Sequence, residues 1–229
     1  MPKILLTILL VFLSVLVFGQ RWQFAAGPGA VLYKGDLLDW HLVPNAAQLK
    51  KMSPSVNFQV RYQEKNAFAY RAKFNFSSLQ GDGSLNPLPV IGYSTNSFSS
   101  PLIDFSLVSE YNFLDYQSNR KIKNWTPYLY GGVSGIFVSP SGSIPNPMTF
   151  FTFSIPYGVG LKYQFSPAWG VQWEFGTSKV LSDVMDGMPS YAGRTLGTPD
   201  KISFSQGDQF LNSSVMFTYS IISIFCPKE

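Results

Sequence analysis

Most of the chain beyond residue 20 alternates between apolar and polar residues with a period of two. Residues 68–76 (FAYRAKFNF) show this most clearly, because Arg71, Lys73 and Asn75 are interleaved with Phe, Tyr and Ala. Successive side chains of a β-strand point to opposite faces, so the spacing predicts strands with one apolar and one polar face. The same pattern recurs at residues 56–63, 103–113, 151–165, 169–181 and 209–225.

Two further strands are predicted with less regular patterns. Residues 22–33 carry apolar residues on one face and Gly27 and Gly29 on the other. Residues 126–138 (TPYLYGGVSGIFV) are apolar on both faces, so no outward side can be assigned. Since no segment after residue 20 shows a helical period, we expect an all-β chain of eight strands.

The connections between these strands differ in length in a regular way. Two of them, 64–67 and 166–168, are tight turns, whereas 34–54, 77–102 and 182–208 are long. Short turns at one end and long loops at the other are typical of bacterial outer-membrane barrels. We therefore predict an eight-stranded antiparallel up-and-down transmembrane β-barrel of the outer-membrane type.

A soluble β-sandwich or lipocalin-like barrel is the alternative, because alternation alone does not say which face is outward. Two features favour the membrane barrel. The apolar faces are rich in Phe, Tyr, Trp and Leu, which are together too bulky for the interior of an eight-stranded barrel. Tyr and Trp also recur near strand ends, as in the aromatic girdles at membrane interfaces. The expected partner of this outer face is outer-membrane lipid.

The first twenty residues predict an export signal. Lys3 is followed by an apolar run of 15 residues from Ile4 to Phe18, and then by Gly19 and Gln20. The run is short for a membrane-spanning helix, which favours a signal peptide at 1–20 over an N-terminal anchor. We expect a single barrel domain at 21–229 and, after signal-peptide removal, a location in the cell outer membrane.

Composition excludes several functional classes. Charged residues are 13% of the chain and aromatic residues 16%, which is incompatible with intrinsic disorder. A single cysteine, Cys226, excludes an internal disulfide framework, and a single histidine, His41, excludes a multi-histidine metal site. The net charge of +4 is spread along the chain, so no nucleic-acid partner is expected. We predict neither a metal site nor a cofactor.

The polar faces of the predicted strands place charged side chains inside the barrel. Buried charges must be paired, so we expect a charge network that fills the lumen and holds the barrel rigid. A narrow ion path or a catalytic cluster is the alternative, and no conducting pore is predicted. The expected members of the lumen network are Arg61, Arg71, Lys73, Asp104, Glu110, Lys162 and Glu174.

Catalysis is not expected. Some small barrels are enzymes that act on outer-membrane lipids, and such a site needs a base beside a nucleophile. The only histidine, His41, lies in the first long loop, and no GxSxG motif occurs. We therefore expect a non-enzymatic protein, with a lipid-modifying enzyme as the weaker alternative.

One predicted turn is longer than barrel closure requires. Residues 114–125 (LDYQSNRKIKNW) carry three basic residues against a single acid, with aromatic residues at both ends. Arginine and large aromatic residues anchor many protein interfaces, although a solvated turn with girdle aromatics gives the same pattern. The candidate contacts with a periplasmic partner are Tyr116, Arg120, Lys121, Lys123 and Trp125.

Several segments, taken in order, resemble a known family. They are AAGPGAVLYKGDL (25–37), the region from VRYQ to LQGD (60–82), FSLVSEYNFLDY (105–116), WTPYLYGGVSGIFVSP (125–140), IPYGVGLKYQFSPAWGVQWEFGTSKVLSDVMD (155–186) and TYSIISIFCPKE (218–229). Together they resemble the PorG-like outer-membrane proteins of Bacteroidota. The first long loop, LLDWHLVPNAAQLKKM (37–52), departs from the pattern expected of that family.

The resemblance implies a structural or anchoring component of a type IX protein secretion complex. In that family, the barrel is thought to tie periplasmic ring subunits of the secretion machine to the outer membrane. Because one fold serves many functions, an independent surface barrel that binds an external partner through its long loops remains an alternative.

Overall fold

A computed structural model of the chain describes residues 22–34, 49–64, 67–82, 97–114, 124–139, 141–142, 149–181 and 208–221. Nearly all of these residues lie in strands, and within this part of the chain no helix has the length and apolar character needed to span a bilayer. The strands are β1 (Trp22–Lys34), β2 (Ser53–Gln63), β3 (Phe68–Asp82), β4 (Ser97–Asn112), β5 (Trp125–Val138), β6 (Ser141–Gly142), β7 (Phe150–Gln164), β8 (Trp169–Val180) and β9 (Gln209–Ser220).

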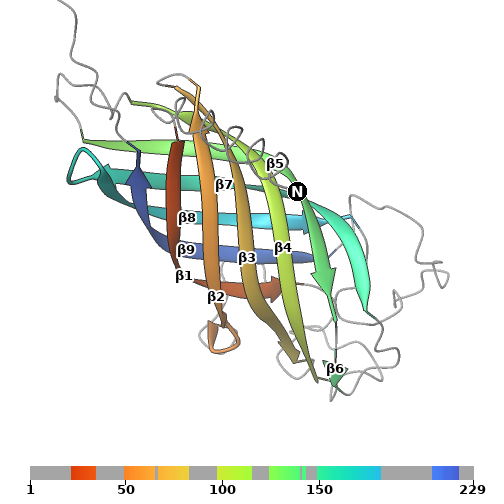
Figure 1. The fold of residues 1–229 in the computed structure, drawn as a ribbon. Coiled ribbons are helices and arrows are strands. Elements are labelled where there is room, and N and C mark those ends of the chain that lie inside the picture. The colour runs from red at the N-terminus through yellow and green to blue at the C-terminus, as the bar shows by residue number, and fades with distance from the viewer. Residues whose placement is uncertain are drawn as a thin grey trace, which may run out of the picture.

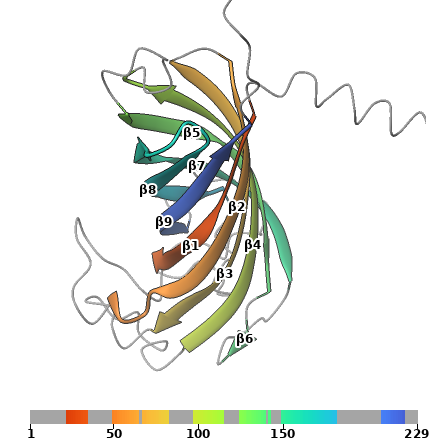
Figure 2. The ribbon, with the colours of Figure 1, turned by 60° about the vertical axis from the view of Figure 1, so that its left-hand side comes forward.

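Eight long antiparallel strands close into a barrel (Figures 1 and 2). Each of the eight long strands pairs with the next long strand along the chain, and β1 also pairs with β9, so the barrel wall has no open edge. The two-residue strand β6 extends the pairing of β5 along β4. This confirms the predicted all-β, eight-stranded antiparallel barrel. Closure satisfies the backbone hydrogen bonds within the wall, as a lipid environment requires.

The register fixes the tilt of the strands. Following Cα partners once around the barrel from Trp22 leads back to β1 at Leu32, ten residues further along. For eight strands, this stagger corresponds to a tilt of about 40°, in the usual range for barrels. Side chains therefore fill the interior, because an eight-stranded barrel is too narrow for a wide channel.

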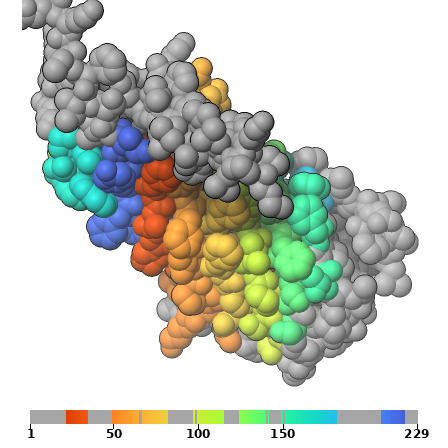
Figure 3. All heavy atoms as spheres, viewed as in Figure 1, coloured from red at the N-terminus to blue at the C-terminus, as the bar shows by residue number. Residues whose placement is uncertain are grey.

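The two faces of the wall have opposite chemistry. On β3, Lys73 and Asn75 are 6% and 0% exposed, whereas Phe74 between them is 45% exposed. Polar side chains thus point into the lumen and aromatic side chains point outward, the reverse of a soluble barrel. Figure 3 shows the outer surfaces of β9, β1, β2, β3 and β4 side by side. The predicted outward faces are confirmed over most of these strands. Leu32 and Leu211 are exceptions: the pattern places them on the apolar faces of 22–33 and 209–225, but they are 0% and 9% exposed and belong to the buried core.

Aromatic side chains surround the barrel at the end that carries the tight turns. They come from neighbouring strands and form ring pairs with centroids about 5 Å apart, such as Trp22 with Tyr62 at 5.2 Å and Trp169 with Tyr219 at 4.8 Å. Phe68 and Tyr111 pair in the same way, at 5.2 Å. This aromatic ring has the character of a membrane-interface girdle.

Several strand boundaries differ from the sequence prediction. Residues 77–82 and 97–102, predicted as loop, belong to β3 and β4. The alternation that marked these strands reverses here, because Leu79 and Leu102 point inward while Ser78 and Ser99 point outward. The predicted strand at 209–225 ends at Ser220, and residues 222–229, including Cys226, lie outside the described residues. The signal peptide and His41 also lie outside them.

Candidate functional site in the barrel lumen

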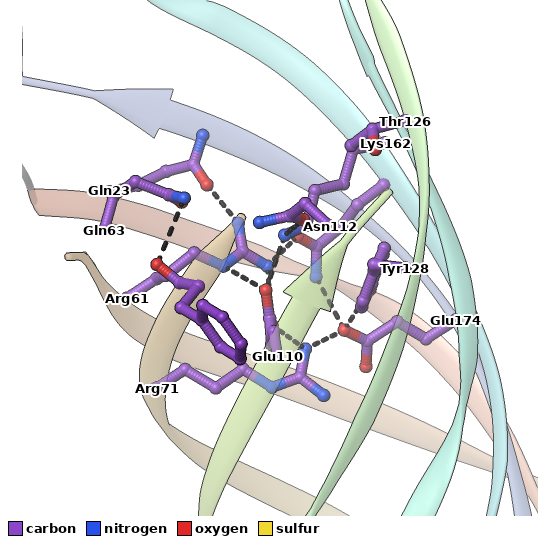
Figure 4. A network of polar contacts seen from close by, with 12 residues as sticks. Gln23, Arg61, Gln63, Arg71, Glu110, Asn112, Thr126, Tyr128, Lys162 and Glu174 are labelled. Atoms are coloured by element: carbon purple, nitrogen blue, oxygen red, sulfur yellow. Dashed lines mark hydrogen bonds and ion pairs between the residues drawn. The ribbon is translucent and has the colours of Figure 1, made fainter. Parts of the chain in front are cut away.

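Six charged side chains meet in the lumen near the tight-turn end. We call them the charged layer. Their exposures are 6% or less, and they come from strands on opposite walls of the barrel. Figure 4 shows most of them pointing toward one another across the interior. The members are Arg61, Arg71, Lys73, Glu110, Lys162 and Glu174.

Glu110 on β4 is one centre of the charged layer. Its carboxylate accepts a hydrogen bond from the Arg61 Nη2 at 3.1 Å, and it forms ion pairs with the Arg61 Nε and the Arg71 Nη1, both at 2.9 Å. The ammonium of Lys162, two strands away on β7, lies 2.5 Å from the Glu110 Oε2 and donates to Asn112 Oδ1 at 2.8 Å. Glu110 thus links strands that are not neighbours in the sheet.

Glu174 on β8 is the second centre. It forms ion pairs with Arg71 and with Lys73, whose Nζ lies 3.0 Å from Oε2. It also accepts from the Tyr128 hydroxyl at 2.6 Å and the Gln172 amide at 3.0 Å. Four donors therefore converge on one buried carboxylate, which is how a buried charge is stabilised.

Glutamine side chains extend the charged layer to the rest of the wall. Gln172 Oε1 accepts from Arg61 at 2.6 Å and from Gln59 Nε2 at 3.2 Å. Arg61 also donates to Gln23, whose own amide donates to Ser220 at 2.9 Å. These contacts brace β1, β2, β8 and β9 against one another.

Two tyrosines complete the charged layer, and the sequence analysis missed both. Arg71 lies over the ring of Tyr130 at 4.6 Å, and Lys162 lies over the ring of Tyr128 at 4.2 Å. These cation–π contacts add to the ion pairs. The strand that carries both tyrosines, β5, was the one for which no outward face could be assigned.

Glycines on the neighbouring strands make room for the tyrosines. A Cβ at Gly160 would overlap the Tyr128 ring, and one at Gly158 would lie 2.7 Å from the Tyr130 hydroxyl. The alternating glycines of β7 face the lumen opposite the tyrosines of β5. This pairing of large with small residues was the sequence signal that could have placed Tyr128 and Tyr130 inside.

Six of the seven predicted lumen charges lie in the charged layer, and the seventh is separate. Asp104 is in the lumen and 4% exposed, but it lies further toward the long-loop end. None of the ion pairs within the described ranges includes it, and its nearby groups are Ser134 and Lys73. Period-two alternation predicts which face a residue occupies, but it does not predict the register that decides which charges meet.

The long-loop end of the lumen is apolar. We call its inward side chains the apolar cap: Val31, Tyr33, Leu79, Leu102, Ile136, Val138, Val180 and Phe210. All are at most 1% exposed, and Met52 packs against them. The Tyr33 hydroxyl donates to Asp208 Oδ1 at 2.7 Å. The lumen is thus filled at one end by paired charges and at the other by hydrophobic packing.

Only one of the predicted partner contacts can be placed. Trp125 begins β5, is 44% exposed, and pairs with Tyr163 in the aromatic ring at the tight-turn end. Its position is that of a girdle residue. Tyr116, Arg120, Lys121 and Lys123 lie outside the described residues. In the part of the chain that is described, no group of three or more His, Cys, Asp or Glu side chains is arranged to hold a metal ion.

Solved structures with this fold include small outer-membrane proteins. Neisserial surface protein A is 12% identical over 87% of this chain and 97% of its own, with a TM-score of 0.51. A major outer membrane protein from Thermus thermophilus is 15% identical over 87% of this chain and 99% of its own, with a TM-score of 0.50. At such identities, the similarity shows the fold alone.

Comparison at the level of sequence gives a family without a known role. No curated protein matches the chain. A family model described as a domain of unknown function, DUF6089, matches residues 2–226 and so includes every strand of the barrel. The charged layer and the apolar cap described above are thus features of a chain that belongs to the DUF6089 family.

Proposed function

We propose that the protein is an integral outer-membrane barrel with a closed lumen and a non-enzymatic, structural role. The observation that carries this proposal is the reversed burial of the wall, with charges inside and aromatic side chains outside. Such an exterior is unfavourable in water, because soluble monomers rarely expose a continuous apolar surface that extends over many strands. Lipid favours it, because the outward Phe, Leu and Val side chains along the middle of the strands then remain in a hydrocarbon environment.

The tight turns belong in the periplasm and the long loops outside the cell under this proposal. This orientation follows from the usual asymmetry of outer-membrane barrels, and the aromatic ring then lies at the periplasmic interface. The charged layer lies near the same end. It acts as a rigid plug, since each of its carboxylates already accepts from several donors.

The specific role that we propose is that of an anchoring component of a type IX protein secretion complex. The support is the resemblance to PorG-like proteins, together with the basic turn at 114–125 on the proposed periplasmic side. Three basic residues would attract an acidic partner surface and guide its approach. The rigid barrel would hold that turn at a fixed position in the membrane.

Affinity purification from native membranes tests this role. We expect periplasmic ring subunits to co-purify with the tagged wild-type barrel. The triple variant Arg120→Ala/Lys121→Ala/Lys123→Ala should reach the membrane normally and lose them. Lys50→Ala, a change in a basic residue just before β2 at the opposite end of the barrel, is the matched control and should retain them.

Two results would contradict parts of the proposal. If the triple variant co-purifies the ring subunits as well as the control does, the basic turn is not the contact. If the wild-type barrel brings down no ring subunit, the type IX role is wrong. A surface barrel that binds an external partner through its long loops would then replace it.

A further inference from the structure

Between the charged layer and the apolar cap, the inward side chains are small and polar. On β3 the inward residues read Arg71, Lys73, Asn75, Ser77 and Leu79 from the tight-turn end to the long-loop end. On β4 and β9 polar inward residues likewise precede an apolar one, with Asp104 before Leu102 and Asn212 before Phe210. We call this level of the lumen the middle chamber, with Asn57, Asn75, Asp104, Asn212 and Ser214 as its defining residues.

Three of these side chains lie next to one another. Asn57, Asn75 and Asp104 are successive Cα partners on β2, β3 and β4. Directly opposed side chains on one face of an antiparallel pair have Cβ atoms about 5 Å apart. The three are at most 4% exposed, so bulk solvent does not reach them.

Polar atoms of the middle chamber are buried without hydrogen-bond partners. They are Asn57 Oδ1, both amide atoms of Asn75, Asp104 Oδ1, Asn212 Oδ1 and Ser214 Oγ. A buried polar group without a partner is destabilising, because folding removes its hydrogen bonds to water and replaces them with nothing. A concentration of such groups at one level of the lumen indicates that something else in the chamber bonds to them.

The mixture of donors and acceptors indicates what that partner is. A cation would serve only the oxygen atoms, and Lys73 next to Asn75 in the same row of inward residues on β3 would repel it. An anion would serve only the donors and would face the Asp104 carboxylate. Water both donates and accepts, and buried waters typically make about three hydrogen bonds to otherwise unsatisfied groups.

The inward side chains at this level are short. At Gly29 on β1 the place of a side chain is taken by the Ser55 hydroxyl and the Asn57 amide, which would lie 2.6 Å and 2.7 Å from a Cβ there, so these polar groups pack directly on the wall. On β4, β5 and β7 the inward residues at this level include Ser106, Ser134 and Ser154, the last two bonded to each other at 2.5 Å. Small hydroxyl side chains leave room that larger inward residues fill elsewhere.

We propose that the middle chamber is a closed site that binds a cluster of water molecules, hydrogen-bonded to Asn57, Asn75 and Asp104. The ion-paired side chains of the charged layer close it on one side, and the hydrophobic packing of the apolar cap closes it on the other. The chamber is therefore a hydrated compartment within the barrel and not part of a through-going channel.

Nuclear magnetic resonance of the folded, full-length barrel in deuterated detergent tests this directly. Magnetisation transfer from water should reach the side-chain amides of Asn57 and Asn75. The comparison is the amide of Gln172, which is buried in the charged layer and already bonded to Glu174. We expect transfer to Gln172 to be at least threefold weaker than to the two asparagines.

Two substitutions of one residue sharpen the test. Asn75→Leu keeps a similar shape but removes both polar atoms, so transfer to Asn57 should fall by at least half. Asn75→Ser keeps a polar group and enlarges the chamber, so transfer to Asn57 should persist. Ser109→Ala, outward on β4, is the control and should change nothing.

The result for the wild-type barrel is decisive even if a variant fails to fold. Absence of water transfer to Asn57 and Asn75 would overturn the proposal, because the chamber would then be dry. Equal transfer to Gln172 would overturn the closed compartment, because water would then extend through the charged layer. Loss of transfer in Asn75→Leu but not in Asn75→Ser would confirm that the chamber binds the water.

Discussion

The two ends of β3 are built with opposite polarity, although they belong to one continuous strand. Near the tight-turn end, Lys73 and Asn75 point inward and Phe74 and Phe76 point outward. Near the long-loop end, Leu79 points inward and is 0% exposed, while Gln80 points outward and is exposed. Strand β9 shows the same reversal. Val215 points outward, whereas Phe210, nearer the long-loop end, points inward.

This difference shows that the surroundings, and not strand propensity, decide which residues face inward. Within the proposed membrane, the outer face must be apolar and the lumen can hold charges. Beyond the membrane, water surrounds the wall, so apolar side chains move inside and form the cap. The apolar band on β3 therefore ends between Phe76 and Ser78. On β5 and β7, aromatic residues continue outward, with Phe137, Phe151 and Phe153 at 47–64% exposure.

Removing one carboxylate from the charged layer should have the largest effect. Glu174→Leu leaves Arg71 and Lys73 buried without one of their acceptors, and we expect a loss of about 3–5 kcal/mol in the free energy of unfolding. Urea titration of the barrel folded into lipid vesicles measures this. Glu174→Gln retains hydrogen-bonding capacity and should lose less. A loss below about 1 kcal/mol for Glu174→Leu would show that the charged layer does not stabilise the barrel.

The boundary between the two parts of β3 can be tested with a matched pair of arginines. Phe74→Arg places a charge on the lipid-facing surface, where we expect a cost of about 2–4 kcal/mol. Ser78→Arg lies on the same face of the same strand, four residues further, and should cost less than about 1 kcal/mol near the interface. The same urea titration compares them. Equal losses for both variants would place Ser78 within the membrane and refute the boundary.

The sequence predicted those strand segments whose outer face is apolar and whose inner face is polar along their whole length. Period-two alternation located six of the eight strands because the outer face stays apolar over most of their length. It failed at residues 77–82 and 97–102, where the alternation reverses as the apolar cap begins. A search for alternation with one fixed outward face treats such a reversal as the end of a strand.

The candidate site was predictable in composition but not in connectivity. Inward charges could be listed from the pattern, yet the separation of Asp104 from the charged layer depends on the register. Tyr128 and Tyr130 were missed because β5 is apolar on both faces. Their place against the glycines of β7 follows from strand pairing, which a single-strand pattern does not contain.

A smaller effect is expected from filling the space beside Tyr128 in the charged layer. Gly160→Ala would bring a Cβ into the Tyr128 ring, and we expect a loss of about 1–3 kcal/mol from overpacking. Tyr128→Leu shortens the opposing side chain, so the double variant should lose less than the sum of the single variants. Thermal unfolding or urea titration of the wild type, the two single variants and the double variant gives the coupling free energy between residues 128 and 160. Strict additivity would mean that the two residues do not touch.

The smallest effect contrasts the two ends of the β8–β9 pair. Trp169 and Tyr219 are Cα partners at the tight-turn end with ring centroids 4.8 Å apart, whereas Lys179 and Gln209 are partners at the long-loop end. Aromatic pairs contribute about 0.5–1.5 kcal/mol beyond their buried area, so a double-mutant cycle with Trp169→Leu and Tyr219→Leu should give a coupling in that range. The equivalent cycle with Lys179→Ala and Gln209→Ala should give a coupling near zero, because partly exposed polar pairs in water contribute little. If the polar pair shows the larger coupling, the aromatic ring does not fix the barrel at its tight-turn end, and the girdle assignment of these residues is wrong.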